Sequence, residues 1–191
     1  MFRAIIVAAG ILASVVASAN ISNVYDLVSA TNVAVSSEAE INGLNWAVGD
    51  TASYSLDISI IKGSMVYTVK AINGTEAVLS QDVDMGFAGK QACETTLDLS
   101  NGQVKKLVCN GQEQQTGDAG NYEVLESKED NITVPAGTFK CLYIKAQDKK
   151  DQKVIEQWAN PKLIPVMGMI KAILPSQMGP ATLQLTAFKK M

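Results

Sequence analysis

The fold class is decided by one stretch, I-T-V-P-A-G-T-F-K-C-L-Y-I-K, which covers residues 132–145. It predicts a β-strand, a Pro-Ala-Gly corner and a second strand that is rich in aromatic and β-branched residues. Pro135 cannot donate a hydrogen bond to a neighbouring strand, so it marks a strand end or an edge. Both alternating sets of side chains after the corner are largely apolar, which predicts a strand covered on both faces.

Working outward, the same period of two recurs along the chain. Ala52, Tyr54, Leu56, Ile58 and Ile60 alternate with polar residues, which predicts a half-buried strand. Turns are expected at residues 62–64, 73–74 and 100–102, and further strands at residues 65–72, 76–85, 91–99, 103–110, 122–128, 154–158 and 182–188. The sequence therefore predicts a mainly β protein with one curved antiparallel sheet, a half-barrel or open barrel of about nine or ten strands, and at most one or two short helices.

The run from Pro161 to Pro180 breaks this pattern. It holds four of the five prolines and three of the seven methionines, and it is too apolar for an ordinary exposed loop. One interpretation is a segment that plugs the open end of the sheet with its own side chains. The other is a flap over an apolar cavity, since unbranched methionines adapt to variable ligands. On this second interpretation, the ligand-binding residues are Trp158, Val166, Met167, Met169, Ile170 and Met178.

The first 19 residues are typical of a secretory signal peptide. Arg3 precedes an apolar run at residues 4–16, and Ala17-Ser18-Ala19 supplies a cleavage site. A retained membrane anchor is the alternative, but 13 apolar residues are fewer than the roughly 20 that cross a bilayer. We expect a loose arm at residues 20–45, a β domain at residues 46–191, and a periplasmic or secreted protein that is not integral to the membrane after signal removal.

The amino-acid composition excludes several kinds of binding and catalytic site. The net charge is −3 and Arg3 is the only arginine, which does not favour nucleic acid as a partner. The chain has no histidine, which excludes Ser-His-Asp catalysis and imidazole-based zinc or haem sites. We predict no cofactor, no metal and no catalytic site. The carboxylates that could act in pairs, and that are expected on a solvated face, are Asp82 with Asp84 and Glu94 with Asp98.

Three cysteines in an exported chain favour one disulfide and one free thiol. Three pairings exist. Cys93 and Cys109 flank a single predicted hairpin and face each other if its loop has three residues, whereas a two-residue loop would displace them by one position. In the favoured pairing, Cys141 is a buried thiol that packs as a small hydrophobic residue.

Three short motifs carry a resemblance: Trp46-Ala47-Val48-Gly49-Asp50 with Tyr54, Val134–Phe139 with Cys141, and Trp158 with Pro161 and Val166–Lys171. In this order they resemble a group of uncharacterised secreted prokaryotic β proteins. In that group W-x-V-G-D opens the domain and V-P-A-G-T-F-x-C lies mid-chain. The resemblance implies a fold similar to the curved half-barrels of periplasmic lipoprotein carriers, whose concave face holds acyl chains.

We therefore expect an exported, non-enzymatic protein that binds an apolar or lipid-like ligand, or an envelope partner, on the concave face of its sheet. The alternative is a structural or interaction module of the cell envelope that has a filled core and no small-molecule ligand. A lined cavity beneath residues 166–178 would favour the first.

Overall fold

The computed structural model describes residues 46–100, 104–114, 122–150, 152–166, 168–176 and 178–191. The predicted signal peptide and arm, residues 1–45, lie outside this part. The strands are β1 (Thr51–Ile58), β2 (Ile61–Asn73), β3 (Glu76–Asp84), β4 (Lys90–Asp98), β5 (Val104–Cys109), β6 (Gln112–Gln114), β7 (Tyr122–Val134), β8 (Gly137–Asp148), β9 (Val154–Ala159), β10 (Met169–Leu174) and β11 (Ala181–Lys189). A three-residue 3-10 helix, η1 (Gly86–Ala88), joins β3 to β4.

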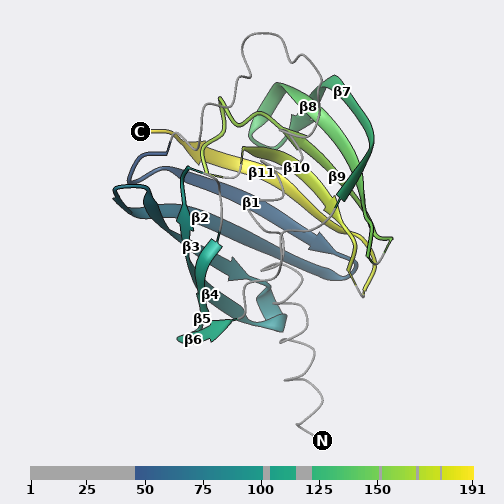
Figure 1. Cartoon of the computed structure of the whole chain (residues 1–191). Coiled ribbons are helices and arrows are strands. Elements are labelled where there is room, and N and C mark those ends of the chain that lie inside the picture. Colours follow the sequence, from purple (N-terminus) through teal and green to yellow (C-terminus); the bar gives the residue numbers. More distant parts are fainter. Residues whose placement is uncertain (1–45, 101–103, 115–121, 151, 167, 177) are drawn as a thin grey trace, which may run out of the picture.

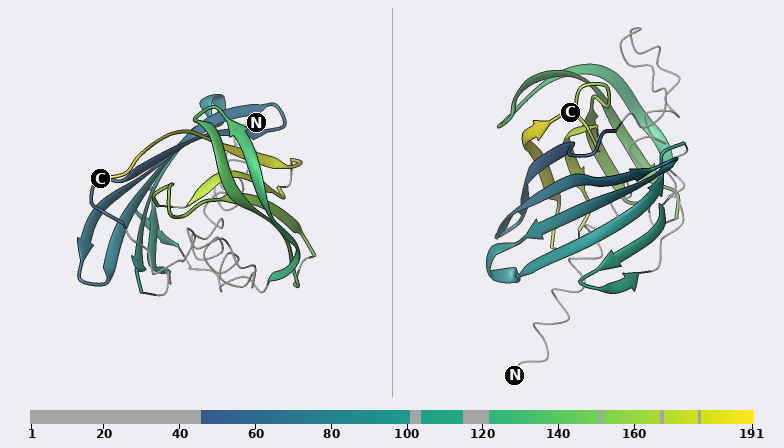
Figure 2. Two further views of the ribbon diagram at one scale, coloured as in Figure 1. Left: turned by 90° about the horizontal axis from the view of Figure 1, so that it is seen from above. Right: turned by 90° about the vertical axis from the view of Figure 1, so that its left-hand side faces the viewer.

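All eleven strands form one antiparallel sheet in the order β6-β5-β4-β3-β2-β1-β11-β10-β9-β8-β7 (Figure 1). The mainly β fold with a single curved sheet is thus confirmed. The number of strands is slightly above the nine or ten predicted. Seen from above, the sheet bends into an arch with β2 to β4 on one flank and β7 to β9 on the other (Figure 2). Among the described residues, no helix is long and apolar enough to cross a membrane.

The inner face of the arch is apolar because each strand alternates. In β1, Ala52, Tyr54, Leu56 and Ile58 are buried, and the residues between them are half-buried. Side chains on both flanks, such as Leu79 and Ile144, belong to a single hydrophobic cluster. Both flanks therefore pack their apolar sides toward the same interior, and the polar sides face outward.

The corner predicted at residues 135–137 turns β7 back into β8 and reaches across to β11. The backbone N–H of Ala136 donates to the carbonyl of Leu185 at 3.1 Å. The rings of Phe139 and Phe188 meet edge to face, with centroids 6.2 Å apart. β8 is buried on both sides from Cys141 to Ile144, as its sequence predicts.

The first turn differs from the prediction. β1 ends at Ile58, and Ser59 and Ile60 form the turn, so Ile60 is 76% exposed and not on the buried face. The residues expected to turn, 62–64, lie inside β2. Gly63 is there because a Cβ at this position would lie 2.5 Å from the Asp84 carbonyl oxygen. Gly63 therefore permits the close approach of two strands and does not form the predicted turn.

Two hairpin turns also differ from the prediction. The β2–β3 loop is Gly74-Thr75, one residue later than expected, because a bulge after Val69 shifts the register. Asn110 and Gly111, with φ of 50° and 78°, form a two-residue turn between β5 and β6. Such Asn-Gly pairs are a strong hairpin signal. The residues after this turn, Gln112–Gln114, form the short strand β6, which the sequence did not predict, and residues 115–121 lie outside the described part.

The Met-rich run supplies a strand that the sequence did not suggest. β10 pairs with β9 on one side and β11 on the other, in the interior of the sheet. Its start is enforced by Gly168, since a Cβ there would lie 2.8 Å from Pro161. The sequence did not predict this strand because β10 has only six residues and contains a bulge, so its alternation of buried and exposed residues is too short to recognise.

We predict that the same substitution, isoleucine to alanine, affects stability very differently at a buried and at an exposed position. Ile170 is fully buried in β10, whereas Ile60 lies exposed in the β1–β2 turn. Ile170→Ala should lower the free energy of unfolding by about 2–5 kcal/mol, because it removes buried methyl groups and leaves a cavity. Ile60→Ala should change it by less than about 0.5 kcal/mol. Urea unfolding followed by circular dichroism measures both, and equal effects would contradict this packing.

Candidate functional site

The inner face carries a buried amide in the middle of an apolar row. Ile144, Gln157, Ala172, Leu183 and Leu56 lie opposite one another on β8, β9, β10, β11 and β1 and therefore share one face. Gln157 is 5% exposed, and its side-chain carbonyl Oε1 is buried without a hydrogen-bond partner. A buried unpaired carbonyl costs about 1–3 kcal/mol, so this position is not optimised for stability.

The opposite flank places more polar groups on the same face. Gln81 is 5% exposed, and its amide nitrogen lies 3.1 Å from the Met65 sulfur, a weak acceptor. Burial raises the pKa of the Tyr67 hydroxyl far above its usual range, so Tyr67 remains neutral. Thr95 is buried nearby on β4. The inner face therefore combines an extensive apolar surface with a few uncharged hydrogen-bonding groups.

The structure brings three of the predicted ligand-binding residues into the interior. Val166, Met169 and Ile170 are all buried, and the Tyr54 hydroxyl donates to the Met169 carbonyl at 3.0 Å. Val166 has φ of 67°, a strained conformation for a β-branched residue. Met178 is 42% exposed in the β10–β11 loop, and Met167 lies outside the described residues. A ligand-binding role for these residues stays a prediction.

Trp158 lies on the outer face, away from that interior. Its indole N–H donates to the Asp130 carboxylate at 2.9 Å, and its ring centroid is 4.9 Å from that of Tyr143. The Lys171 ammonium lies 4.9 Å from the Trp158 centroid. The ring is thus held by neighbours on three adjacent strands, an arrangement that stabilises the sheet.

Two of the four candidate carboxylates, Asp84 and Asp98, are held by neighbouring groups. Asp84 pairs with Lys90 at 2.8 Å and accepts the Gly86 N–H at 2.9 Å, and these bonds hold its pKa below the usual range. Ser100 donates two bonds to Asp98 and likewise lowers its pKa. Asp82 and Glu94 are exposed. Within the described ranges, no group of three or more His, Cys, Asp or Glu side chains is arranged to hold a metal ion.

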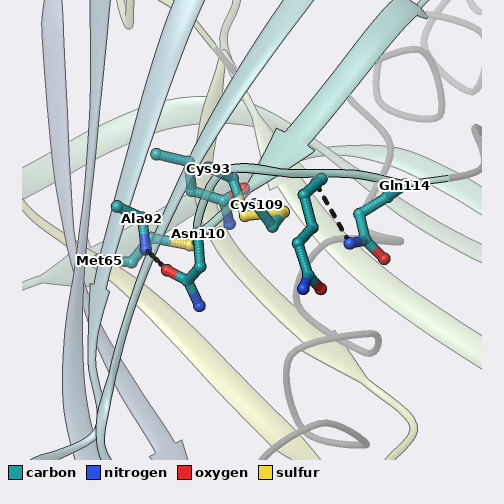
Figure 3. Close-up of a disulfide and its surroundings, with 8 residues drawn as sticks. Met65, Ala92, Cys93, Cys109, Asn110 and Gln114 are labelled. Atoms are coloured by element: carbon teal, nitrogen blue, oxygen red, sulfur yellow. Dashed lines mark hydrogen bonds between the residues drawn. A yellow bond between two sulfur atoms is a disulfide. The ribbon is translucent and has the colours of Figure 1, made fainter.

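The disulfide joins Cys93 of β4 to Cys109 of β5, which confirms the favoured pairing (Figure 3). A bulge between Thr96 and Leu97 shifts the register nearer the loop, and loop residues 101–103 lie outside the described part. Beside it, Asn110 and Ala92 exchange two hydrogen bonds: the Asn110 N–H donates to the Ala92 carbonyl, and the Ala92 N–H donates to the Asn110 side chain. The bridge therefore fastens the short strands β5 and β6 to the main sheet at its weakest edge.

We predict that reduction destabilises the protein through this bridge. The cysteines are 16 residues apart, and closing a loop of this length contributes about 3 kcal/mol in the chain-entropy model. Dithiothreitol should lower Tm by roughly 6–12 °C. The double variant Cys93→Ser/Cys109→Ser should have the lower Tm both with and without dithiothreitol. A Tm that reduction leaves unchanged in the unaltered chain would contradict this assignment.

Cys141 is the free cysteine, buried in β8 as predicted. Its thiol lies 3.5 Å from the Asp130 carbonyl oxygen. Burial, and secondarily the Asp130 charge, raises the pKa of this thiol to about 12. The thiolate that reacts with electrophiles is therefore scarce at neutral pH.

We accordingly predict that Cys141 is inert in the folded protein. At pH 8 roughly one molecule in ten thousand would carry the thiolate, since pH 8 lies about four units below this pKa. Ellman's reagent should report almost no thiol in the native protein and one per chain in guanidinium chloride without reductant. Cys141→Ala should give none in either condition. Rapid labelling of the native protein would show that the thiol is accessible.

Comparison with known proteins gives only distant similarities. No family model matches the chain, and no curated protein matches it. Solved structures with a similar fold include a candidate exported protein with a YmcC-like fold from Bacteroides fragilis, with 11% identity, 76% of this chain and 97% of that chain covered, and a TM-score of 0.45. A hypothetical protein from Chlamydia trachomatis has 11% identity, 77% and 89% coverage, and a TM-score of 0.48.

A third structure, MucB, has 8% identity and a TM-score of 0.45. The match covers 90% of this chain and 59% of MucB, so the chain spans less than two thirds of that protein. At such identities and TM-scores the likeness carries no functional information.

Proposed function

We propose that this protein is an exported, non-enzymatic carrier or sensor that holds an apolar or lipid-like ligand on the inner face of its arched sheet. The observation that carries this proposal is the buried Gln157 amide within an apolar row, with its carbonyl unpaired. Apolar side chains would contact an acyl chain, and the amide would hydrogen-bond its polar end. A side-chain amide can present either its oxygen or its NH₂ after a simple rotation, so it suits a carboxylate, hydroxyl or ester.

The architecture supports the same proposal. A sheet normally buries its apolar face against a second layer of helices or strands. Among residues 46–191 that the structure describes, the strands form one sheet, and no helix longer than η1 accompanies it. Because its inner-face side chains are already buried, an apolar molecule could act as that second layer only if the two flanks moved apart to admit it.

Export is supported by the leader-like residues 1–19 and by the disulfide, because disulfides persist mainly in oxidising compartments. A non-enzymatic role is supported by the absence of histidine from the sequence and by the lowered pKa values of Asp84 and Asp98. General acids that work near neutral pH need raised pKa values.

One observation favours the second candidate, an envelope interaction module with a filled core. Inner-face side chains such as Leu56, Ile144 and Leu185 are at most 1% exposed, as in a core that is already packed. Such a module would act on an envelope protein through its outer face. The two candidates differ in whether the purified protein holds or binds an apolar molecule.

We predict that Gln157→Leu separates stability from binding. The free energy of unfolding of the variant should be about 1–3 kcal/mol higher, because the substitution removes a buried unpaired carbonyl. It should also bind dansyl-undecanoic acid about tenfold more weakly, because the probe loses its polar contact. Fluorescence titration measures the affinity, and thermal unfolding measures the stability.

The matched control is Gln184→Leu, the same change on β11. Gln184 pairs with Ser55 and Lys171 on the outer face, so its replacement should leave probe binding unchanged. Native mass spectrometry would reveal a co-purified ligand. An empty protein that also fails to bind the probe would leave the filled-core module as the function. Equal affinity in the unaltered and Gln157→Leu proteins would place the ligand elsewhere.

A further inference from the structure

Among the described residues, the two most exposed large apolar side chains, Phe87 and Ile60, project from neighbouring turns at one rim of the sheet. Val48, Leu163 and Met191 are exposed to a smaller extent at the opposite rim. The register places the β1–β2, β3–β4, β8–β9 and β10–β11 connections at the same end of their strands. The exposed large apolar residues of these connections and their first flanking positions are Phe87, Ile60, Met178 and Val154. We call this end of the sheet, defined by those four residues, the apolar rim.

The two foremost residues of the apolar rim are strongly exposed. Phe87 is 81% exposed and Ile60 is 76% exposed, the highest fractions among large hydrophobic residues in the described part of the chain. Phe87 is at the centre of η1, between Gly86 and Gly89, which have φ values of 59° and 107°. A position that served only the fold would not require an aromatic side chain there.

The side chains of the apolar rim project as separate points and do not form one flat patch. We call these projecting side chains the tips. Phe87, Ile60 and Met178 lie on connections spaced two strands apart, and neighbouring strands are about 4.8 Å apart, so the tips follow one another at roughly 10 Å. A stable protein interface needs about 800 Å² of complementary surface on each partner. Isolated apolar tips suit a soft phase into which each can insert independently.

Lysines accompany the tips. Ile60, Phe87 and Val154 each have a lysine within three residues, namely Lys62, Lys90 and Lys153, and each also has an aspartate within three residues, namely Asp57, Asp84 and Asp151. The side chains of Lys62 and Lys90 are 73% and 79% exposed, and each pairs with an aspartate, Asp57 and Asp84. Lysine is depleted at protein–protein interfaces but favoured at membrane surfaces, where its stem lies along apolar material and its ammonium reaches the headgroups.

From these observations we propose that the apolar rim docks on a lipid bilayer, with Phe87 and Ile60 entering the headgroup region and the lysines contacting lipid phosphates. This is reversible binding at the interface and involves no spanning segment. The proposal goes beyond the proposed function, because it requires no ligand on the inner face. It would nevertheless give an apolar ligand a short path between membrane and protein.

The test places a fluorescent reporter at each rim of the exported protein. Phe87→Trp and Leu163→Trp exchange an exposed side chain on opposite rims, since Leu163 is 43% exposed in the β9–β10 connection. Both variants keep the same N-terminal residues and the same Trp46 and Trp158. Vesicles of phosphatidylethanolamine and phosphatidylglycerol, with bromine on the acyl chains, should quench the added indole of Phe87→Trp and not that of Leu163→Trp.

A second measurement uses loss of binding. Phe87→Ser and Ile60→Ser should each lower the vesicle partition coefficient about tenfold, whereas Leu163→Ser should leave it unchanged. Each altered residue is exposed, so the fold should persist. Equal quenching at both rims, no quenching, or partition unaffected by both serine variants would overturn the proposal. An emission blue shift of the Phe87→Trp variant with protein concentration alone would also overturn it and would indicate contact between copies of the chain.

Discussion

The whole structure depends on how a single sheet buries its own apolar face. Strands β1 to β3 and β8 to β11 all point apolar residues inward, and the arch brings them into one cluster. Bulges at the β1–β11, β2–β3, β4–β5, β7–β8 and β9–β10 pairings add the twist and bending that a flat ladder lacks. The bond from Ala136 to Leu185, with the Phe139–Phe188 contact, returns the far hairpin to β11. Without that curvature, each flank would expose its apolar side to water.

The motifs that carry the resemblance have structural tasks in this arch. Asp50 is fully buried, and its carboxylate accepts the N–H groups of Ala47 at 2.9 Å and Met191 at 2.7 Å, which ties the entry of β1 to the chain beyond β11. Residues 134–137 form the corner that reaches Leu185, and Gly168 packs against Pro161. Because geometry alone accounts for these residues, the motifs indicate a shape that similar sequences would share, and they do not indicate a ligand.

Much of the fold could be predicted from period-two alternation, because one buried face imposes it on β1 and β3, whereas β8 could be predicted from its continuous apolar run. The Cys93–Cys109 pairing could be predicted because the two residues flank a single hairpin. Prediction from the sequence was wrong where a residue type is compatible with two structural roles or where a strand is short. Gly63 allows strand approach but resembles a turn, and β10 is too short and too bulged to show its period. Gln81 and Gln157 interrupt apolar alternation, so they are apparent as inner-face groups only when neighbouring strands are in register. Trp158 was predicted among the ligand-binding residues, but its pairing with Tyr143 and Lys171 places it on the outer face, and the sequence alone does not show which face a strand residue occupies.

Two of the features that the fold does not require, the unpaired Gln157 carbonyl and the exposed Phe87 ring, lie at separate places. Elsewhere the chain protects its surface: the long edge strand β7 exposes Glu123, Glu126, Lys128 and Glu129, charges that oppose edge-to-edge association. Against this background, the unpaired Gln157 carbonyl costs stability, and the exposed Phe87 costs solubility. Sequences keep such locally unfavourable residues mainly where function needs them. One lies within the inner face and the other at a rim, so ligand contact and surface docking can be separated by substitution, since neither residue supports the other.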